Sequence, residues 1–219
     1  MIFKPLNGKM GADRIEKNKF MPKQIIIIRG GDAFVTEEKY LDYLRKKEVS
    51  REYFYPRKSW KNDLSQELGA DWEILIPRMP CQDNAKYAEW KIWFERLFPF
   101  VENGTILLGS SLGGIFLAKY LSENKFPKKI SALFLVAAPH SDMEGLESFT
   151  LEKSLKGVAE QCSIIHLYQS QDDVVVPMKE VEKYQKELPG AKMHIFKDRG
   201  HFKQKHFPEI VEEIKKLAR

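Results

Sequence analysis

The most regular feature of the chain is a series of short apolar runs that alternate with amphipathic, helix-like stretches. Within each run the apolar residues are nearly continuous, which is typical of strands buried on both faces of a parallel sheet. The predicted strands span residues 24–31, 72–77, 104–110, 130–139, 163–170 and 192–198. The predicted helices span residues 59–69, 85–101, 113–124, 178–188 and 207–218. This alternation predicts an α/β fold, a three-layer α/β/α sandwich with a mostly parallel sheet and right-handed crossovers.

A long insertion after the first predicted strand interrupts the alternation. Residues 32–58 exceed an ordinary strand-to-helix loop. Within them, Thr36 stands at an N-cap position before two acidic residues, and Tyr40, Leu41 and Leu44 follow at helical spacing. We expect an extra helix followed by an aromatic-rich turn. This insertion is either a surface decoration or a lid-like wall over a site.

The two ends of the chain set the expected domain limits. Residues 1–23 form an N-terminal extension, and residues 24–219 form a single domain. The extension is a flexible basic segment, an added strand or a product of start-site choice, and the sequence leaves these alternatives open. It has no long apolar region typical of a secretory signal, and no segment is long enough to span a membrane.

Composition excludes several other classes of protein. The 219 residues include 36 Lys and Arg against 31 Asp and Glu, so the net charge of +5 is spread over a chain rich in both signs. Nucleic-acid binding is therefore not expected, because it usually needs a concentrated basic patch. Cys81 and Cys162 are far apart, which favours reduced thiols in a cytoplasmic protein. The histidines show no metal-ligand spacing, and we expect neither a metal nor a cofactor.

The third predicted strand ends in the pattern G-x-S-x-G, with Ser111 at its centre. This pattern follows an apolar run and opens a helix, which is the context of a sharp strand–turn–helix that exposes a nucleophilic serine. Small flanking residues are needed because the turn is tight and its backbone strained. The pattern selects Ser111 over Ser110. The alternative is a turn whose glycines serve only close packing.

A serine nucleophile needs a base and an acid, and both follow in the expected order. Asp172 and Asp173 lie just past the fifth predicted strand, and His201 lies just past the sixth. Because ligands bind at the carboxyl ends of the strands in an open α/β sheet, these side chains are expected near Ser111. The alternatives are an N-capping or surface acid and a loop histidine.

The motifs "GSSLGG", "DDVVVP" and "GHF" carry a family resemblance. From about Gln24 onward the chain resembles an α/β-hydrolase, and its size and sparse cap are similar to the small single-domain serine hydrolases. In that family the acid commonly lies four residues before the proline of a D-x-x-V-P segment, which selects Asp173 and leaves Asp172 as the alternative. The family histidine follows a glycine, which selects His201 over His206.

An oxyanion hole requires two backbone donors, and the sequence offers one candidate for each. The first is the amide of Leu112, directly after the nucleophile. The second lies in the turn after the first strand, where alignment with the resembling family selects Gly31. Family members often have His-Gly or Pro-Gly at this turn, so Arg29 is a departure. The guanidinium of Arg29 either lies near the site or points away from it and forms a salt bridge.

Further substrate contacts are expected at Gly30 and Asp32 in the same turn and at His140, which follows the fourth strand. A solvated loop position is the alternative for His140. The segment 147–155 is expected to continue the loop and helix on that side of the site.

Two functional hypotheses follow. The first is a serine hydrolase that cleaves an ester, thioester or amide of a small acyl substrate through Ser111, Asp173 and His201 and an acyl-enzyme intermediate. The same residues would also serve acyl transfer. The second is a hydrolase-like module that binds a protein partner and has weak or vestigial catalysis, motivated by the Arg29 turn and the insertion. Nothing in the pattern indicates an oligomeric state.

Overall fold

Six parallel strands form the centre of the molecule. The computed structural model describes residues 23–55, 59–141, 143–151 and 154–217. Within these residues the strands lie in the order β2-β1-β3-β4-β5-β6, and every neighbouring pair is parallel. Their bounds are β1 Lys23–Ile28, β2 Trp72–Leu75, β3 Thr105–Ser110, β4 Ile130–Val136, β5 Ile165–Ser170 and β6 Lys192–Phe196. All six predicted strands are present.

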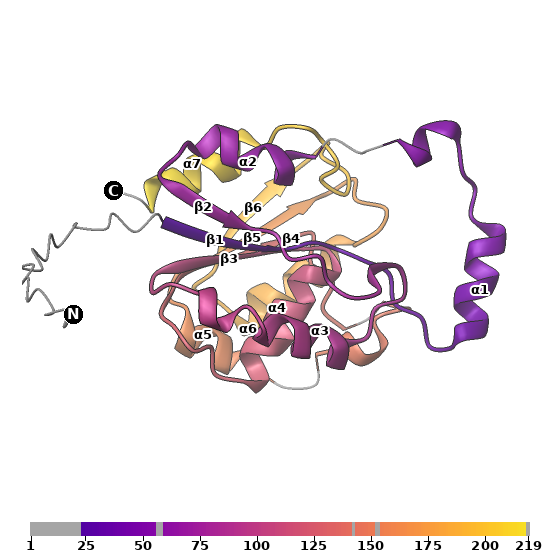
Figure 1. The fold of residues 1–219 in the computed structure, drawn as a ribbon, viewed down its shortest axis with the longest axis horizontal. Helices are drawn as coiled ribbons and strands as arrows, with labels where there is room; N and C mark the ends of the chain where they lie inside the picture. The colour runs from indigo at the N-terminus through magenta and orange to yellow at the C-terminus, as the bar shows by residue number, and fades with distance from the viewer. Residues whose placement is uncertain (1–22, 56–58, 142, 152–153, 218–219) are drawn as a thin grey trace, which may run out of the picture.

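Helices cover both faces of the sheet (Figure 1). On one face lie α2 (Trp60–Leu68) and α7 (Pro208–Lys216), and on the other lie α3 (Tyr87–Glu95), α4 (Leu112–Glu123), α5 (Lys156–Gln161) and α6 (Met178–Glu187). Each interface contains its own cluster of buried apolar side chains. The predicted three-layer α/β/α sandwich is therefore confirmed. Among the described residues, no helix combines the length and apolar character that a bilayer span requires.

Two helices differ from the sequence prediction. The helix expected over residues 85–101 ends at Glu95 and is followed by a short 3-10 turn, Phe98–Phe100. Pro99 accounts for the interruption, because proline has no amide to donate and its ring clashes with the preceding turn. The helix α5 has only six residues, which is too short for a helical period to stand out in the sequence.

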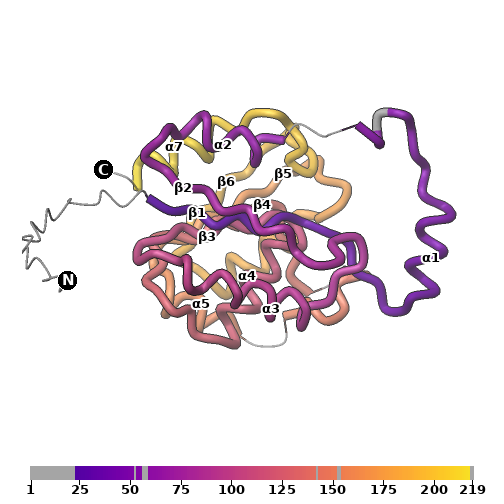
Figure 2. The backbone as a smooth tube through the Cα atoms, viewed as in Figure 1, coloured from indigo at the N-terminus to yellow at the C-terminus, as the bar shows by residue number. Residues whose placement is uncertain are grey.

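The insertion after β1 contains the expected helix, α1 (Glu37–Lys46), capped by the side chain of Thr36. No residue of α1 is buried. The helix projects beyond the carboxyl ends of the strands (Figures 1 and 2). The ring of Phe34 packs at 5.3 Å from that of Tyr40 and 5.0 Å from that of Tyr43. Residues 1–22 of the predicted extension and 56–58 of the insertion lie outside the described residues, and Lys23 already belongs to β1.

The first turn of α4 packs directly on the end of β1. A Cβ atom on Gly113 would lie 2.2 Å from the carbonyl oxygen of Ile28 and 2.6 Å from that of Arg29. A Cβ atom on Gly109 would lie 2.5 Å from the carbonyl oxygen of Gly113. These contacts are with backbone atoms, so no side-chain rearrangement could relieve them. Only glycine allows this approach of helix and strand.

We predict that Gly113→Ala lowers the free energy of unfolding by about 1–3 kcal/mol, the usual effect of overpacking a rigid interior. Denaturant unfolding measures it. Gly190→Ala is the matched control, because a Cβ atom there meets nothing within 4 Å. Equal stability of the two variants would contradict the close contact.

A stack of rings crosses β4, β5 and β6 on the face covered by α7. The rings of Phe134 and His166 lie 4.5 Å apart and nearly parallel, and the rings of Tyr168 and His194 lie 4.2 Å apart. The Nδ1 atom of His166 lies 2.9 Å from Nε2 of His194. Burial, aided by the charge of His194, lowers the pKa of His166 to about 4. The pKa of His194 is also lowered by burial. The imidazole of His166 is therefore neutral in the folded protein near pH 7.

These shifts predict a loss of stability in acid. As pH falls from about 6.5, the ordinary histidine value, to about 4, the unfolded chain takes up a proton that folded His166 does not. The free energy of unfolding therefore falls through this window. His166→Gln should make this decrease in the free energy of unfolding smaller. His206→Gln is the control, because it removes a largely exposed imidazole and should leave the decrease unchanged. Unfolding curves at a series of pH values test this, and an unchanged slope in His166→Gln would contradict it.

Candidate active site

Ser111 occupies the sharp turn between β3 and α4. Its backbone has φ 55° and ψ −127°, a conformation that non-glycine residues seldom adopt. The turn is held by a hydrogen bond of 2.9 Å from the Ser111 amide to the carbonyl oxygen of Val136. Ser110 is instead the last residue of β3 and is buried in the sheet. The strained position is therefore that of Ser111.

The turn after β1 lies directly against Ser111. A Cβ atom on Gly30 would lie 2.9 Å from the Cβ atom of Ser111, so only a glycine leaves the serine side chain free. The residues after Gly31 are fastened to the turn that begins at Gln82. The Asp32 amide donates to the carbonyl oxygen of Gln82, and the Ala85 amide donates to that of Asp32, both at 2.8 Å. This bracing fixes the backbone opposite the serine.

Asp173 and His201 meet across the ends of β5 and β6. The Nδ1 atom of His201 lies 2.8 Å from Oδ2 of Asp173, whose side chain is fully buried. The other oxygen, Oδ1, accepts hydrogen bonds from the amides of Val175 and Val176 at 2.8 and 3.0 Å. Burial alone would raise the pKa of Asp173, but the hydrogen bonds from His201 and these amides outweigh it, and the pKa is lowered. The carboxylate therefore stays ionised beside the imidazole.

Asp172 has a different set of partners. Its Oδ1 atom accepts hydrogen bonds from the Ser170 hydroxyl at 2.5 Å and from the Gly200 amide at 2.9 Å. The Ser170 hydroxyl in turn accepts from the Arg199 amide. Asp172 thus joins the end of β5 to the loop that carries His201. The structure pairs the histidine with Asp173, and the neighbouring carboxylate stabilises the histidine loop.

Ser111 lies where two cavities meet. The first, of about 350 Å³, is mostly apolar. Its apolar walls come from the insertion, the start of α4, the loop after β4 and the loop after β5, with Phe34, Leu112, Pro139, Met143, Leu146 and Val176 among the lining residues. The second, of about 610 Å³, has polar and apolar surface in nearly equal parts and contains His201 together with Ser111. We call it the polar cavity because several charged side chains line it. Within the described residues the Ser111 hydroxyl makes no hydrogen bond, so it is free to meet a ligand.

The two expected oxyanion donors lie beside this junction. Leu112 is the first residue of α4, and a helix leaves its first amides without an intrahelical acceptor. Gly31 follows the end of β1 and lines both cavities. Among the described residues, neither amide donates a hydrogen bond to a backbone carbonyl beyond the regular bonding of the helices and strands. Both positions are therefore compatible with binding an oxyanion next to Ser111.

Asp32 and Gly30 also border the site. Asp32 lines both cavities, and Gly30 lines the polar one. The Tyr43 hydroxyl donates a long hydrogen bond of 3.5 Å to Oδ2 of Asp32. Burial raises the pKa of Asp32, while the nearby charge of Lys47 lowers it and leaves the net pKa above its usual value.

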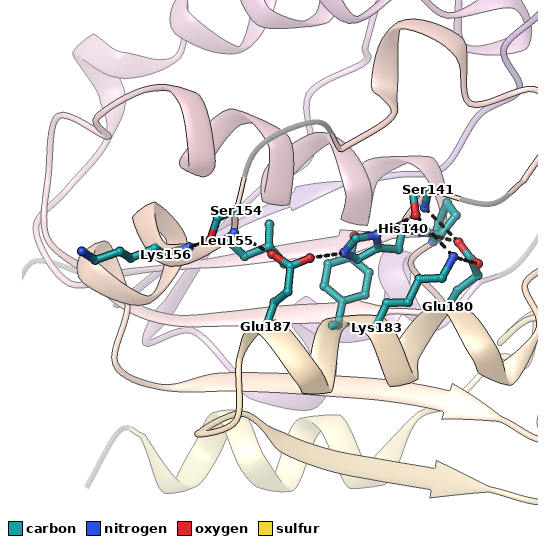
Figure 3. A network of polar contacts seen from close by, with 10 residues as sticks. His140, Ser141, Ser154, Leu155, Lys156, Glu180, Lys183 and Glu187 are labelled. Carbon is teal, nitrogen blue, oxygen red and sulfur yellow. Dashed lines mark hydrogen bonds and ion pairs between the residues drawn. The ribbon is translucent and has the colours of Figure 1, made fainter.

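His140 lies away from the cavities, in a polar network that ties the loop after β4 to α6 (Figure 3). Its Nε2 atom lies 2.9 Å from Oε1 of Glu187, and its ring packs against Tyr184. The amides of His140 and Ser141 donate to the buried carboxylate of Glu180 at 2.8 and 3.0 Å. This placement argues against a substrate contact for His140. The network instead supports the loop that forms one wall of the apolar cavity.

Sequence reasoning missed several residues that shape the site. Tyr43, from α1, lines both cavities, and Lys61, from the first turn of α2, lines the polar one. The helical period of the insertion was readable, but the direction in which α1 packs was not. Lys61 resembles any solvated lysine at a helix start, so no pattern in the sequence distinguishes it.

A parallel sheet in this order, with a serine in the turn after the central strand and a paired acid and histidine beyond later strands, defines an α/β-hydrolase-type serine hydrolase. Comparison with known proteins agrees. The chain belongs to the serine hydrolase family, whose profile matches residues 56–217. It is 29% identical to the serine hydrolase RBBP9 of Rattus norvegicus over 152 residues, 67% of this chain and 78% of the relative.

Solved structures are similar to this chain over most of its length. The ydeN gene product of B. subtilis superposes with a TM-score of 0.70 at 16% identity, covering 90% of this chain and 98% of that protein. An esterase from Exiguobacterium antarcticum superposes with a TM-score of 0.54 at 14% identity, covering 90% and 93%. At these identities the superpositions support the α/β-hydrolase fold alone.

The two adjacent carboxylates are expected to respond differently to amidation. Asp173→Asn should lower kcat by about 10⁴-fold, because an amide favours the wrong imidazole tautomer and cannot stabilise the imidazolium. Asp172→Asn should retain most of the wild-type kcat, because an amide oxygen can still accept from Ser170 and Gly200. Steady-state kinetics on an activated ester measures both. A larger loss in Asp172→Asn than in Asp173→Asn would assign the acid to Asp172.

Proposed function

We propose that this serine hydrolase cleaves an ester, thioester or amide bond of a small acyl substrate through an acyl-enzyme on Ser111. The observation that carries the proposal is the pair Asp173–His201, whose histidine lines the same cavity as the strained Ser111, a serine with no hydrogen-bond partner among the described residues. In the proposed arrangement, Nδ1 of His201 is bonded to the Asp173 carboxylate. Nε2 is then left to accept the proton of the Ser111 hydroxyl.

The proposed reaction has two halves. The Ser111 oxygen attacks the substrate carbonyl carbon while Nε2 of His201 accepts the hydroxyl proton, and Asp173 stabilises the imidazolium. The amides of Leu112 and Gly31 donate to the oxyanion. The bond to the leaving group breaks as His201 returns the proton, which leaves an ester on Ser111. Water, activated by His201, then attacks this ester and releases the acid.

The two cavities suggest how the substrate lies. The apolar cavity has Leu112 in its wall but not His201, so it suits the acyl chain. The polar cavity contains His201, the general acid for the leaving group, so it suits the leaving group. The described part of the insertion forms the outer wall of both through Tyr43. We therefore regard residues 24–219 as one domain in which the insertion acts as a lid.

Labelling with a fluorophosphonate probe tests the nucleophile. We expect one adduct, located by peptide mass spectrometry on Ser111, and at least a thousandfold (~10³) loss of ester turnover in Ser111→Ala. Ser110→Ala is the matched control and should still be labelled, because Ser110 lies in the sheet. An adduct on another residue, or full turnover by Ser111→Ala, would reject the proposal.

A further inference from the structure

Among its described lining residues, the polar cavity has more lysines than carboxylates. Lys47, Lys61 and Lys203 line it together with Asp32 and Asp83. Their arrangement is uneven, because the carboxylates come from the β1 turn and the turn at Gln82, whereas two of the lysines come from the start of α2 and the histidine loop. The charges therefore fall into two groups, one beside the insertion and one beside α2.

Beside the insertion, the charge of Lys47 is balanced by neighbouring protein groups. The ammonium of Lys47 donates a hydrogen bond to the hydroxyl of Tyr43, lies 4.6 Å from the centre of its ring, and is 4.9 Å from the ring centre of Tyr53. Its charge also acts on Asp32, whose pKa it lowers. Lys47 is therefore already engaged by protein groups.

The group beside α2 is not compensated. Among the described residues, Lys61 has no carboxylate partner within ion-pair distance, and its ammonium lies 4.6 Å from the centre of the Trp60 ring. The charge that acts on it is that of Arg29. Burial, with a smaller contribution from Arg29, lowers the pKa of Lys61 to about 8. Lys61 thus brings to the wall of the cavity a positive charge that no carboxylate among the described residues neutralises.

Arg29 contacts the same turn of α2 but is not among the residues that line the cavity. Its Nη2 atom donates to Oδ1 of Asn62, while Nε is buried without a partner among the described residues. Burial lowers the pKa of Arg29. Bringing two desolvated cations together is unfavourable for folding unless an anion offsets the repulsion. A lysine in a cavity whose pKa is shifted by burial and by a neighbouring charge is a candidate functional residue.

We propose that the leaving group of the substrate carries an anionic group, a carboxylate or a phosphate, that binds Lys61 in the polar cavity, with the nearby charge of Arg29 adding to the attraction. This assignment rests on the proposed hydrolase function. His201, the proposed general acid, lines only the polar cavity, so the leaving group lies there, next to Lys61. Lys203, exposed at the rim, adds to the attraction, and so does the N-terminal end of α2, whose cap residue Ser59 lines the cavity. The substrate class is an apolar acyl group joined to an anionic leaving group.

A set of three butyryl esters tests this directly. Two have anionic leaving groups, 4-hydroxybenzoate and 4-hydroxyphenyl phosphate, and the third has the neutral methyl ester of 4-hydroxybenzoate. The readout is the ratio of kcat/KM for each anionic ester to that for the neutral ester. We expect a ratio of about ten or more for the wild type, equivalent to one ion-pair interaction of about 1.4 kcal/mol. The anionic ester with the larger ratio identifies the preferred group.

Variants assign the preference to the residues. Lys61→Gln should bring the ratio close to one, Arg29→Gln should lower it, and Lys61→Arg should retain it because the charge remains. Lys205→Gln is the matched control, since Lys205 is exposed and outside the cavity lining, and it should keep the wild-type ratio. Fluorophosphonate labelling of each variant confirms that Ser111 is still assembled.

The outcomes separate the two proposals. A wild-type ratio near or below one, or a Lys61→Gln ratio equal to that of the wild type, would overturn the anionic leaving group while leaving the hydrolase function intact. If the wild type hydrolyses none of the three esters and Ser111 is not labelled, the hydrolase mechanism itself fails.

Discussion

The close contact between the first turn of α4 and the end of β1 is the constraint on which the site depends. Gly113 brings the helix against the carbonyl oxygens of Ile28 and Arg29, and Gly30 brings the β1 turn against Ser111. The chain between β3 and α4 then has room only for a sharp turn, and Ser111 takes the strained backbone conformation. Packing of the central layers thus exposes the serine and places the β1 turn beside it. The strain is offset by the buried sheet on one side and the helix on the other.

The same edge of the sheet brings together the other two residues of the proposed triad. Because β5 and β6 run parallel to β3, the loops after them open toward Ser111, and Asp173 and His201 meet there at 2.8 Å. Two polar networks stabilise this edge. Asp172 fastens the histidine loop through Gly200 and Ser170, and Glu180 with Glu187 fastens the loop after β4 through His140. The residues around Asp173 and His201 therefore hold the loops, whereas Ser111 and His201 line a cavity.

The sheet and the principal residues were predictable because their signals are local. Continuous apolar runs indicated all six strands, and the glycine spacing selected Ser111. The choice of Asp173 over Asp172 came from family resemblance, and the contact with His201 agrees with it. The role of His140 was not predictable, since its partners lie on α6 and are far away in sequence. The charge of Lys61 in the polar cavity was hidden for the same reason, because Lys61 looks solvated until α2 is packed beside the β1 turn.

The central claim is that catalysis proceeds through an ester on Ser111. It is tested most directly by quenching the protein in acid during a single turnover of an activated butyryl ester and measuring its mass. We predict a transient species heavier by one butyryl group, with the added mass on the peptide that contains Ser111 and absent in His201→Ala. Complete product formation without any acylated protein, or acylation of a different residue, would contradict the mechanism.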